Sequence, residues 1–190
     1  MKLESKTSDS HLVKLILDGK KSAFKSLYNR YSKLLLLVCL RYTKNRATAE
    51  DMLQDAFIKV YKSLSQFDPN RGEFKHWSKR IVINTCLQKL RKKTVLDEFE
   101  DLVEISMRPM VASEAIHNLS LQELTKIIQA MPPGYRTIFN LYVIDGYNHK
   151  EIGKLLGISD STSKTQLMKA KKFLQKNIQR TSYNLLHNYA

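Results

Sequence analysis

Glycine and proline are scarce in this sequence of 190 residues, which contains 6 glycines and 4 prolines. A β-sheet protein needs such residues at the turns between its strands, and that punctuation is missing here. The apolar residues mostly recur at spacings of three and four, which is the period of an amphipathic helix. The sequence therefore predicts an all-α protein.

Cysteine and long apolar runs are also rare, and both absences exclude classes of protein. The 2 cysteines, Cys39 and Cys86, form no Cys-x-x-Cys pattern, which excludes a disulfide-rich framework and a cysteine-based zinc site. The longest apolar run, residues 34–40, is far shorter than the roughly 20 residues of a membrane-spanning helix. Residues 1–6 lack the apolar core of a signal peptide. We therefore expect a cytoplasmic protein without direct membrane insertion.

Acidic residues are outnumbered by basic ones, 18 against 32, which gives the chain a formal charge of +14. Such an excess is unfavourable in a compact fold unless the protein binds a polyanion, so nucleic acid or an anionic membrane surface is the expected class of partner. The basic residues concentrate in residues 71–93 and 149–180, and the segment between them is acidic. Two basic surfaces joined by an acidic linker suggest two grips on one nucleic acid.

Turn residues and apolar spacing divide the chain into two small helical domains. We expect the first domain over residues 10–94, an acidic linker over 95–118 and the second domain over 119–180. Residues 67–72 are expected to form a loop, and the last dozen residues are expected to fray as a tail. The expected helices cover residues 11–18, 21–42, 46–66, 73–93, 119–130, 134–145, 148–156 and 160–178.

The second domain contains a pattern typical of a helix-turn-helix over residues 149–162. Gly153 is small where the partner helix approaches closely, and Gly157 can adopt the left-handed conformation that ends a helix. Ser159 or Asp160 can cap the second helix, whose first turns would then enter the major groove of DNA. The candidate DNA-binding residues of this helix are Thr162, Lys164, Thr165, Met168, Lys169, Lys171 and Lys172. The alternative is a plain helical hairpin with a solvated basic face.

One position departs from the helix-turn-helix pattern. Ser163 lies where such motifs usually carry an aliphatic residue that packs between the two helices. Leu167, one turn later, can supply that packing. We expect the unit to be less stable because of the exchange.

The helix expected over residues 46–66 has an unusual outer face. Its core side is formed by Leu53, Phe57, Val60 and Leu64. Its opposite side combines three polar or acidic residues with one aliphatic residue: Asp51, Gln54, Asp55 and Ile58. An apolar side chain among acidic ones on a solvent face is typical of a surface that docks another protein. The alternative is an ordinary solvated face with one exposed aliphatic residue, which is common.

Aromatic and basic residues are interleaved over residues 67–84. This combination suits single-stranded nucleic acid, because rings stack on bases and cations hold phosphates. Amide side chains can also read base edges. The candidate DNA-binding residues of this segment are Asn70, Arg71, Phe74, Lys75, Trp77, Arg80 and Asn84. The alternative is that Phe74 and Trp77 belong to the core of the first domain, and for Phe74 the core is the favoured assignment.

Four stretches of the sequence together resemble the bacterial RNA polymerase sigma factors of the extracytoplasmic-function (ECF) group. They cover residues 49–57, 67–77, 131–136 and 148–170, and their order and separation make the resemblance specific. The resemblance implies two helical parts, similar to sigma regions 2 and 4, without the extra middle domain of larger sigma factors. It also implies that the acidic linker threads through the polymerase cleft, where it can mimic nucleic acid.

The resemblance implies partners as well. Asp51, Gln54 and Asp55 match positions that dock on the clamp helices of the largest catalytic subunit of core RNA polymerase, and Ile58 shares their face. Promoter DNA is the second implied partner. Many members of the group are also held by an anti-sigma protein, which is a possible third partner here.

The remaining candidate residues match positions that contact promoter DNA. Residues 70–74 match the loop that takes up a flipped base of the minus-ten element. The upstream edge of the melted region is matched by Trp77, Arg80 and Asn84. The minus-thirty-five element is matched by Lys164, Thr165, Met168 and Lys169.

We therefore expect a sigma factor that binds core polymerase, directs promoter recognition and helps melt DNA, with no cofactor, metal, small-molecule substrate or enzymatic activity. One alternative is a stand-alone helix-turn-helix regulator, which would need a dimer interface or ligand pocket in the first 95 residues. Another alternative is a metal-dependent nuclease, which would need clustered carboxylates. Its candidate residues would be Glu50, Asp51, Asp55 and Glu73.

Overall fold

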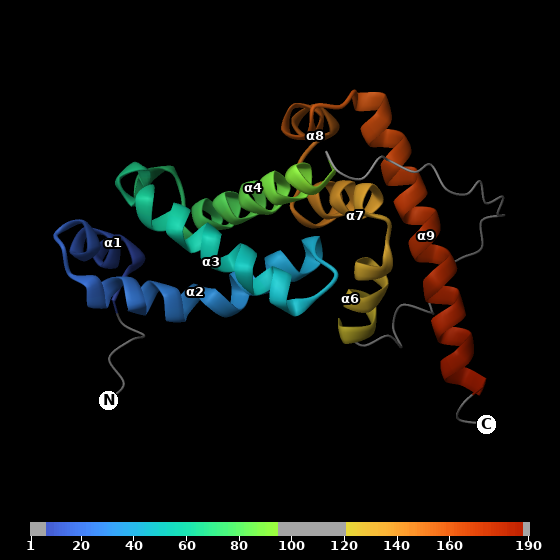
Figure 1. Cartoon of the computed structure of the whole chain (residues 1–190), viewed down its shortest axis with the longest axis horizontal. Helices are drawn as coiled ribbons and strands as arrows, with labels where there is room; N and C mark the ends of the chain where they lie inside the picture. Colours follow the sequence, from blue (N-terminus) through green and yellow to red (C-terminus); the bar gives the residue numbers. More distant parts are fainter. Residues whose placement is uncertain (1–6, 95–120, 188–190) are drawn as a thin grey trace. The chain divides into compact units, whose positions relative to one another are not determined.

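The computed structural model describes residues 7–94 and 121–187 of the chain (Figure 1). Every regular element within these two ranges is helical, so the all-α expectation is confirmed for them. The chain divides into two compact units, Met1–Glu98 and Phe99–Ala190, and each is described by itself. The expected acidic linker, residues 95–118, lies outside the described residues. No helix of the described ranges is both long enough and apolar enough to cross a membrane.

The first unit is built from the helices α1 (Asp9–Leu17), α2 (Lys21–Tyr42), α3 (Arg46–Lys62) and α4 (Phe74–Thr94), with short 3-10 turns at Leu64–Gln66 and Pro69–Arg71. The helix expected over residues 46–66 is therefore shorter than predicted. Its last turn tightens where the backbone N–H of Ser63 bonds to the carbonyls of Lys59 and Val60 at 3.0 and 3.1 Å. The expected loop over residues 67–72 contains the second 3-10 turn.

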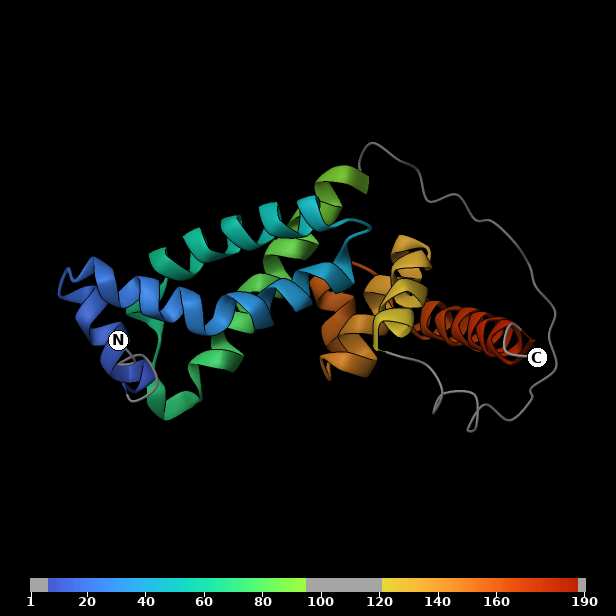
Figure 2. The ribbon, with the colours of Figure 1, turned by 90° about the horizontal axis from the view of Figure 1, so that it is seen from below.

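The core of the first unit lies between α2, α3 and α4. Helices α2 and α3 run antiparallel beside each other in both views, and α4 packs against both of them (Figures 1 and 2). The Phe57 ring packs against the rings of Phe24 and Tyr28, with centroids 6.2 and 4.6 Å apart. The core side predicted for residues 46–66 is confirmed, because Leu53, Phe57 and Val60 of α3 and Leu64 of the following 3-10 turn are all buried.

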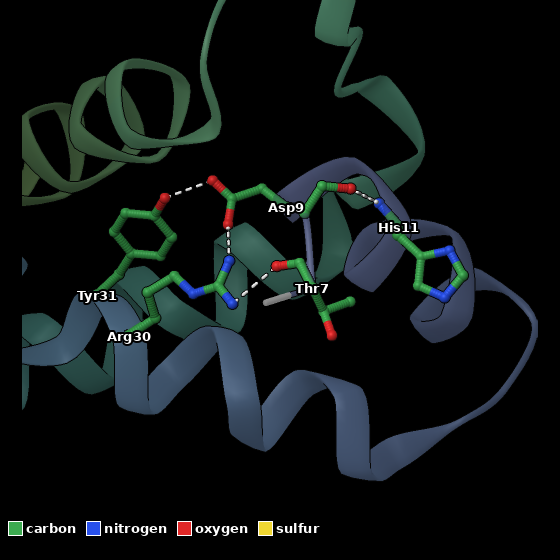
Figure 3. A network of polar contacts seen from close by, with 6 residues as sticks. Thr7, Asp9, His11, Arg30 and Tyr31 are labelled. Carbon is green, nitrogen blue, oxygen red and sulfur yellow. Dashed lines mark hydrogen bonds and ion pairs between the residues drawn. The ribbon is translucent and has the colours of Figure 1, made fainter. Parts of the chain in front are cut away.

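A polar network fastens α1 to α2 (Figure 3). The carboxylate of Asp9 accepts a hydrogen bond from Arg30 Nη1 at 2.5 Å and a second one from the Tyr31 hydroxyl. Arg30 Nη2 donates to the carbonyl of Thr7 at 2.9 Å. Burial and the hydrogen bond to Asp9 raise the pKa of Tyr31 well above its ordinary value. The start of α1 is therefore held by charged and polar contacts, while Leu12 and neighbouring apolar residues pack into the core.

The second unit is built from the helices α6 (Leu121–Ala130), α7 (Pro133–Phe139), α8 (His149–Leu156) and α9 (Asp160–His187), and a π-helical turn at Asn140–Ile144 follows α7. The other three helices all contact α9, which is therefore the spine of the unit. The prediction that the last dozen residues fray as a tail is wrong up to His187, because α9 continues to that residue.

Arg136 joins the first two helices of this unit. Its side chain is buried, and Nη1 donates to the carbonyl of Gln129 near the end of α6 at 2.7 Å. Burial lowers the pKa of this guanidinium. A buried charge of this kind requires hydrogen-bond partners, so the bond to α6 restricts where α7 can lie.

Cys39 of α2 and Cys86 of α4 meet in the core of the first unit. Both side chains are fully buried, and the Cys86 thiol donates to the sulfur of Cys39 at an Sγ–Sγ distance of 4.0 Å. This hydrogen bond and the burial raise the pKa of Cys86. The separation of the two residues in sequence gave no indication that their side chains touch.

We expect both thiols to be protected in the folded protein. Alkylation requires a thiolate that the reagent can reach, and here it requires local opening of the α2–α4 contact. Iodoacetamide at pH 8 should modify the native chain at least about tenfold more slowly than the chain unfolded in urea. Mass spectrometry of timed samples measures both rates, and equal rates would contradict the buried pair.

Candidate docking and nucleic-acid interfaces

The acidic ridge, defined as Asp51, Gln54, Asp55 and Ile58, lies on the outer face of α3. The opposite face of this helix packs into the core, so the ridge is turned toward solvent. Asp51 and Gln54 are exposed, Ile58 is 54% exposed, and Asp55 is half-buried. The structure thus brings the four predicted residues together on one accessible surface.

The two carboxylates of the ridge have different surroundings. Asp55 forms an ion pair with Lys89 of α4, with 2.6 Å between Nζ and Oδ2. Lys59, one turn further along α3, donates to Gln88 of α4 at 2.6 Å. Among the described residues Asp51 has no ion-pair partner. Asp51 is therefore the charge that a docking protein can use without breaking an existing pair.

Two partly exposed tyrosines lie on or against α3, and sequence reasoning missed both. Tyr61 is 50% exposed and Tyr28 is 38% exposed. Both belong to the aromatic contacts between α2 and α3, since Tyr61 packs on Phe24 with ring centroids 5.0 Å apart. Tyr61 follows Ile58 at a spacing of three, so helical periodicity could have found it. Tyr28 comes from another helix, and only the tertiary contact reveals it.

A hollow of about 380 Å³ opens between α1 and the loop before α4. Asn70 and Glu73 line it from the loop, and Asp9 and Ser10 line it from α1. The 3-10 turn of the loop is held by Asp68, whose carboxylate accepts the backbone N–H of Asn70 at 2.9 Å. The hollow is large enough for a nucleobase and presents several hydrogen-bonding groups.

Phe74 requires a correction to the predicted DNA-binding set. Its side chain is 1% exposed, and its ring packs against Tyr31, Phe67 and Trp77 with centroids 5.2 to 5.5 Å apart. A buried ring cannot stack on a base, so the core alternative holds for Phe74. It supports the hollow from the core side. Trp77 is half-buried against the same apolar cluster, so part of its surface remains accessible.

The other predicted residues around the hollow and along α4 are at least partly accessible. Asn70, Arg71, Lys75 and Arg80 are exposed, and Asn84 is half-buried. Arg71 and Lys75 adjoin residues that line the hollow, whereas the charged residues of the lining itself are Asp9 and Glu73. Cations next to a base-sized hollow suit the phosphates that flank an unstacked base.

In the second unit, α8 and α9 form the predicted helix-turn-helix. Asn148 and Glu151 cap α8 reciprocally, with side-chain to backbone distances of 3.0 and 2.8 Å. Gly157 ends α8 in the left-handed conformation at φ 72°. Ser159, one of the two predicted N-caps, caps α9, because its hydroxyl accepts a hydrogen bond from the backbone N–H of Thr162 at 3.1 Å.

Gly153 is required by the turn rather than by the partner helix. A Cβ atom at this position would lie 2.8 Å from the carbonyl oxygen of Ile158 and 3.3 Å from the Asp160 carboxylate. The first contact is closer than a Cβ atom tolerates, and its partner is backbone. The prediction of a close approach at Gly153 is therefore right, but the approaching group is the chain between the two helices.

A polar contact replaces the aliphatic one that Ser163 cannot make. Ser163 is fully buried, and its Oγ lies 2.8 Å from Nδ1 of His149 at the start of α8. The imidazole of His149 in turn stacks on the Tyr142 ring with centroids 4.4 Å apart. Leu167 is buried, as predicted. Close by along α9, the side-chain oxygen of Gln166 is buried with no hydrogen-bond partner among the described residues, a cost that an apolar residue would not carry.

The recognition face, defined as the exposed side of the first turns of α9, carries the predicted residues. The opposite side of the helix is buried at Ser163, Leu167 and Ala170. The exposed members of the predicted set are Thr162, Lys164, Thr165, Met168, Lys169, Lys171 and Lys172. The lysines thus share the solvent side of α9, where a groove of DNA could receive them.

The carboxylates considered for a nuclease do not gather. Glu50 forms an ion pair with Arg46 at 2.7 Å, and Asp55 is paired with Lys89. Throughout residues 7–94 and 121–187, no three His, Cys, Asp or Glu side chains are grouped closely enough to hold a metal ion. The described part of the chain therefore offers no metal-binding carboxylate cluster.

Comparison with known protein families gives two matches, one in each unit. Residues 27–95 match the family described as Sigma-70 region 2, and residues 121–174 match the family described as Sigma-70, region 4. The two matches together cover more than half of the chain. The first contains the acidic ridge and the loop beside the hollow, and the second contains the helix-turn-helix.

Individual relatives of the chain are named as ECF RNA polymerase sigma factors. The chain is 29% identical over 181 residues to the ECF RNA polymerase sigma factor SigW of Bacillus subtilis, covering 87% of this chain and 94% of that protein. It is 25% identical over 190 residues to the ECF RNA polymerase sigma-E factor of Escherichia coli K12, covering 93% and 97%.

Solved structures share the fold. One is the sigma factor RpoE of Bartonella quintana in complex with the anti-sigma factor NepR, with a TM-score of 0.50, 21% identity and coverage of 80% of this chain and 94% of that chain. Another is CnrH in complex with the cytosolic domain of CnrY, with a TM-score of 0.50, 20% identity and coverage of 92% and 99%.

We expect Gly153→Ala to destabilise the second unit by about 1–2 kcal/mol, because the backbone displacement outweighs the roughly 1 kcal/mol that alanine gains over glycine in a helix. Urea unfolding followed by circular dichroism measures the loss. The single tryptophan, Trp77, lies in the first unit, so its fluorescence transition should stay at the wild-type midpoint and serves as an internal control. An unchanged dichroism transition would contradict the close contact at Ile158.

Proposed function

Because this chain belongs to the extracytoplasmic-function group of the sigma-70 family, we propose that its two helical units divide the work of a sigma factor between them. The protein is a sigma factor that binds core RNA polymerase and directs it to promoters. We propose residues 10–94 as the part that contacts the polymerase and the minus-ten element, and residues 119–180 as the part that contacts the minus-thirty-five element. Residues 95–118 would then connect the two.

Docking on the polymerase is proposed for the acidic ridge. The observation that supports it most is the exposure of Asp51 and Ile58 on one face of α3. An apolar centre gains from burial in a complex, and an unpaired carboxylate beside it selects a basic partner surface. Tyr61 and Tyr28 would enlarge the apolar part of this contact, since tyrosine contributes strongly to protein interfaces.

Promoter melting is proposed for the hollow between α1 and the loop before α4. A base that leaves the duplex would enter the hollow, and Arg71, Lys75 and Arg80 would hold the neighbouring phosphates. Extrusion of a base costs a few kcal/mol, which its contacts in the hollow must offset. The DNA would therefore open because the protein binds the unstacked form preferentially, and no covalent step is needed. Trp77 and Asn84 would lie at the upstream edge of the opened region.

Recognition of the minus-thirty-five element is proposed for the recognition face of α9. Its lysines would supply phosphate contacts and salt-dependent affinity, whereas Thr165 and Met168 would supply contacts to base edges. A stand-alone regulator would need a dimer interface or ligand pocket of its own, and no specific feature of the described residues favours that function.

We further propose that the protein acts in the cytoplasm, where the polymerase transcribes, and that it has no enzymatic activity of its own. An anti-sigma protein is proposed as a third partner. The complex of the structural relative RpoE with the anti-sigma factor NepR supports this, as does the exposed Tyr61 next to the ridge on α3.

Asp51→Arg should weaken binding to core polymerase by at least about tenfold, because it reverses the ridge carboxylate that has no ion-pair partner within the described ranges. The matched control is Glu50→Arg, which makes the same charge change at the neighbouring residue, off the ridge. Binding of both variants can be measured by fluorescence anisotropy of labelled protein at one fixed salt concentration. Equal affinity of the two variants would remove the ridge from the interface.

The proposed function itself is tested by run-off transcription with core polymerase on a genomic fragment library. Wild-type protein should direct transcripts from a small set of start sites, and Lys169→Gln should reduce their yield several-fold while lowering the salt dependence of promoter binding. Lys14→Gln on α1 is the control with the same charge change. The absence of site-specific transcripts from folded wild-type protein would refute the proposal.

A further inference from the structure

His149 is held in a fixed orientation at the edge of the recognition face. Its Nδ1 lies 2.8 Å from the buried hydroxyl of Ser163, and its ring stacks on Tyr142 at an interplanar angle of 24°. These two contacts restrain both the position and the rotation of the imidazole. With Nδ1 engaged, Nε2 is the polar atom of the ring that remains for a ligand, since no partner of Nε2 is present among the described residues.

The ring of His149 lines a hollow of about 340 Å³ between α8 and α9. Three amines line the same hollow from α9: Lys164, Lys171 and Lys172. All three lysines are exposed, and the apolar floor is provided by Leu167 and Met168. A concave surface with three cations and an oriented imidazole is complementary to a small anion that carries several acceptor oxygens.

We propose that this hollow binds a phosphate group of the DNA backbone, and that His149 donates a hydrogen bond to it through Nε2. The inference rests on the proposed DNA contact of α9 and deepens it, because it adds His149 to that contact. Phosphate contacts fix the register of a protein on the duplex without reading sequence. His149 would therefore position the recognition helix, and the bases themselves would be read by other side chains.

The charge state of His149 links this contact to pH. In the protonated ring both nitrogens donate, so Nδ1 can bond to Ser163 and Nε2 can bond to the phosphate at the same time. A bound phosphate favours the protonated ring, because only that form offers one donor to the phosphate and another to Ser163. DNA binding should therefore weaken as the pH rises and the imidazolium loses a proton.

Other ionisable groups face the ring as well. Lys164, Lys171 and Lys172 of α9 line the hollow together with the ring, and the phosphate would neutralise their charges. Tyr142 contributes a neutral phenol to the stack, and Lys150 and Glu151 follow His149 on α8. The change in titration on DNA binding therefore reports the arrival of a negative charge in this hollow.

The test is an NMR titration of the histidine ring protons in the full chain, with and without a 20-base-pair duplex of mixed sequence. The His149 signal is assigned by its loss in His149→Gln. We expect the duplex to move its titration midpoint upward by about half a pH unit or more, which corresponds to roughly twofold or more tighter binding at pH 5.5 than at pH 7.5. A second duplex of unrelated sequence should give the same displacement, because the contact is to the backbone.

Two controls make the outcome decisive. His149→Gln should lose the pH dependence of duplex affinity, whereas His76→Gln, which changes an exposed histidine of the first unit, should lose much less of it. Inorganic phosphate, tested alone, should move the midpoint less than the duplex does. An unmoved His149 midpoint while the duplex is bound would overturn the inference. So would a midpoint that inorganic phosphate moves and the duplex does not. Either result would leave the proposed promoter contact of α9 intact.

Discussion

A helix in a small protein can bury only one side, and this constraint determines where the acidic ridge and the recognition face lie. In α3 the buried side includes Leu53, Phe57 and Val60, so Asp51 and Ile58 have to face solvent. In α9 the buried side includes Leu167 and Ala170, so the lysines of the recognition face lie together on the other. The apolar packing therefore positions both charged surfaces, although it contacts neither partner. A change in the core that rotated α3 or α9 by one residue would turn the acidic ridge or the recognition face away from its present direction.

Polar contacts, by contrast, determine how neighbouring helices meet. Asp9 fixes α1 on α2, Arg136 fixes α7 on α6, and Ser163 fixes α9 on His149 of α8. Each of these contacts is directional, so it specifies one arrangement where apolar packing alone would tolerate several. A buried polar group without a partner lowers the stability of the fold. The side-chain oxygen of Gln166 is such a group, as far as the described residues show. The second unit thus combines a defined geometry with limited stability.

Local patterns in the sequence were sufficient for the helices and for most candidate residues. The spacing of Leu53, Phe57 and Val60 predicted which side of α3 is buried, because helical period alone decides that. The Gly157 and Ser159 pattern predicted the turn before α9, because caps are local. The roles of the ridge and of the recognition face in binding stay predictions.

Contacts between distant residues were not predictable in the same way. The meeting of Cys39 with Cys86 depends on how α2 packs on α4, and the bond of Ser163 to His149 depends on the angle of the helix-turn-helix. Trp77 shows the same limit, because an aromatic residue beside cations suits a base or a core equally well until its neighbours are known. The extension of α9 to His187 was missed because its last turns carry few apolar residues in a regular period.

The row of lysines along α9 also affects the protein before it meets DNA. Lys169, Lys172 and Lys176 are exposed and follow one another at spacings of three and four, so their like charges repel along the helix. A polyanion that neutralises them relieves this repulsion, so binding at this row would stabilise the helix. Dissolved salt has two opposite effects, since it shields the repulsion and also weakens the attraction to DNA. The ionic strength that best preserves the free protein is therefore higher than the one at which it holds a promoter most tightly.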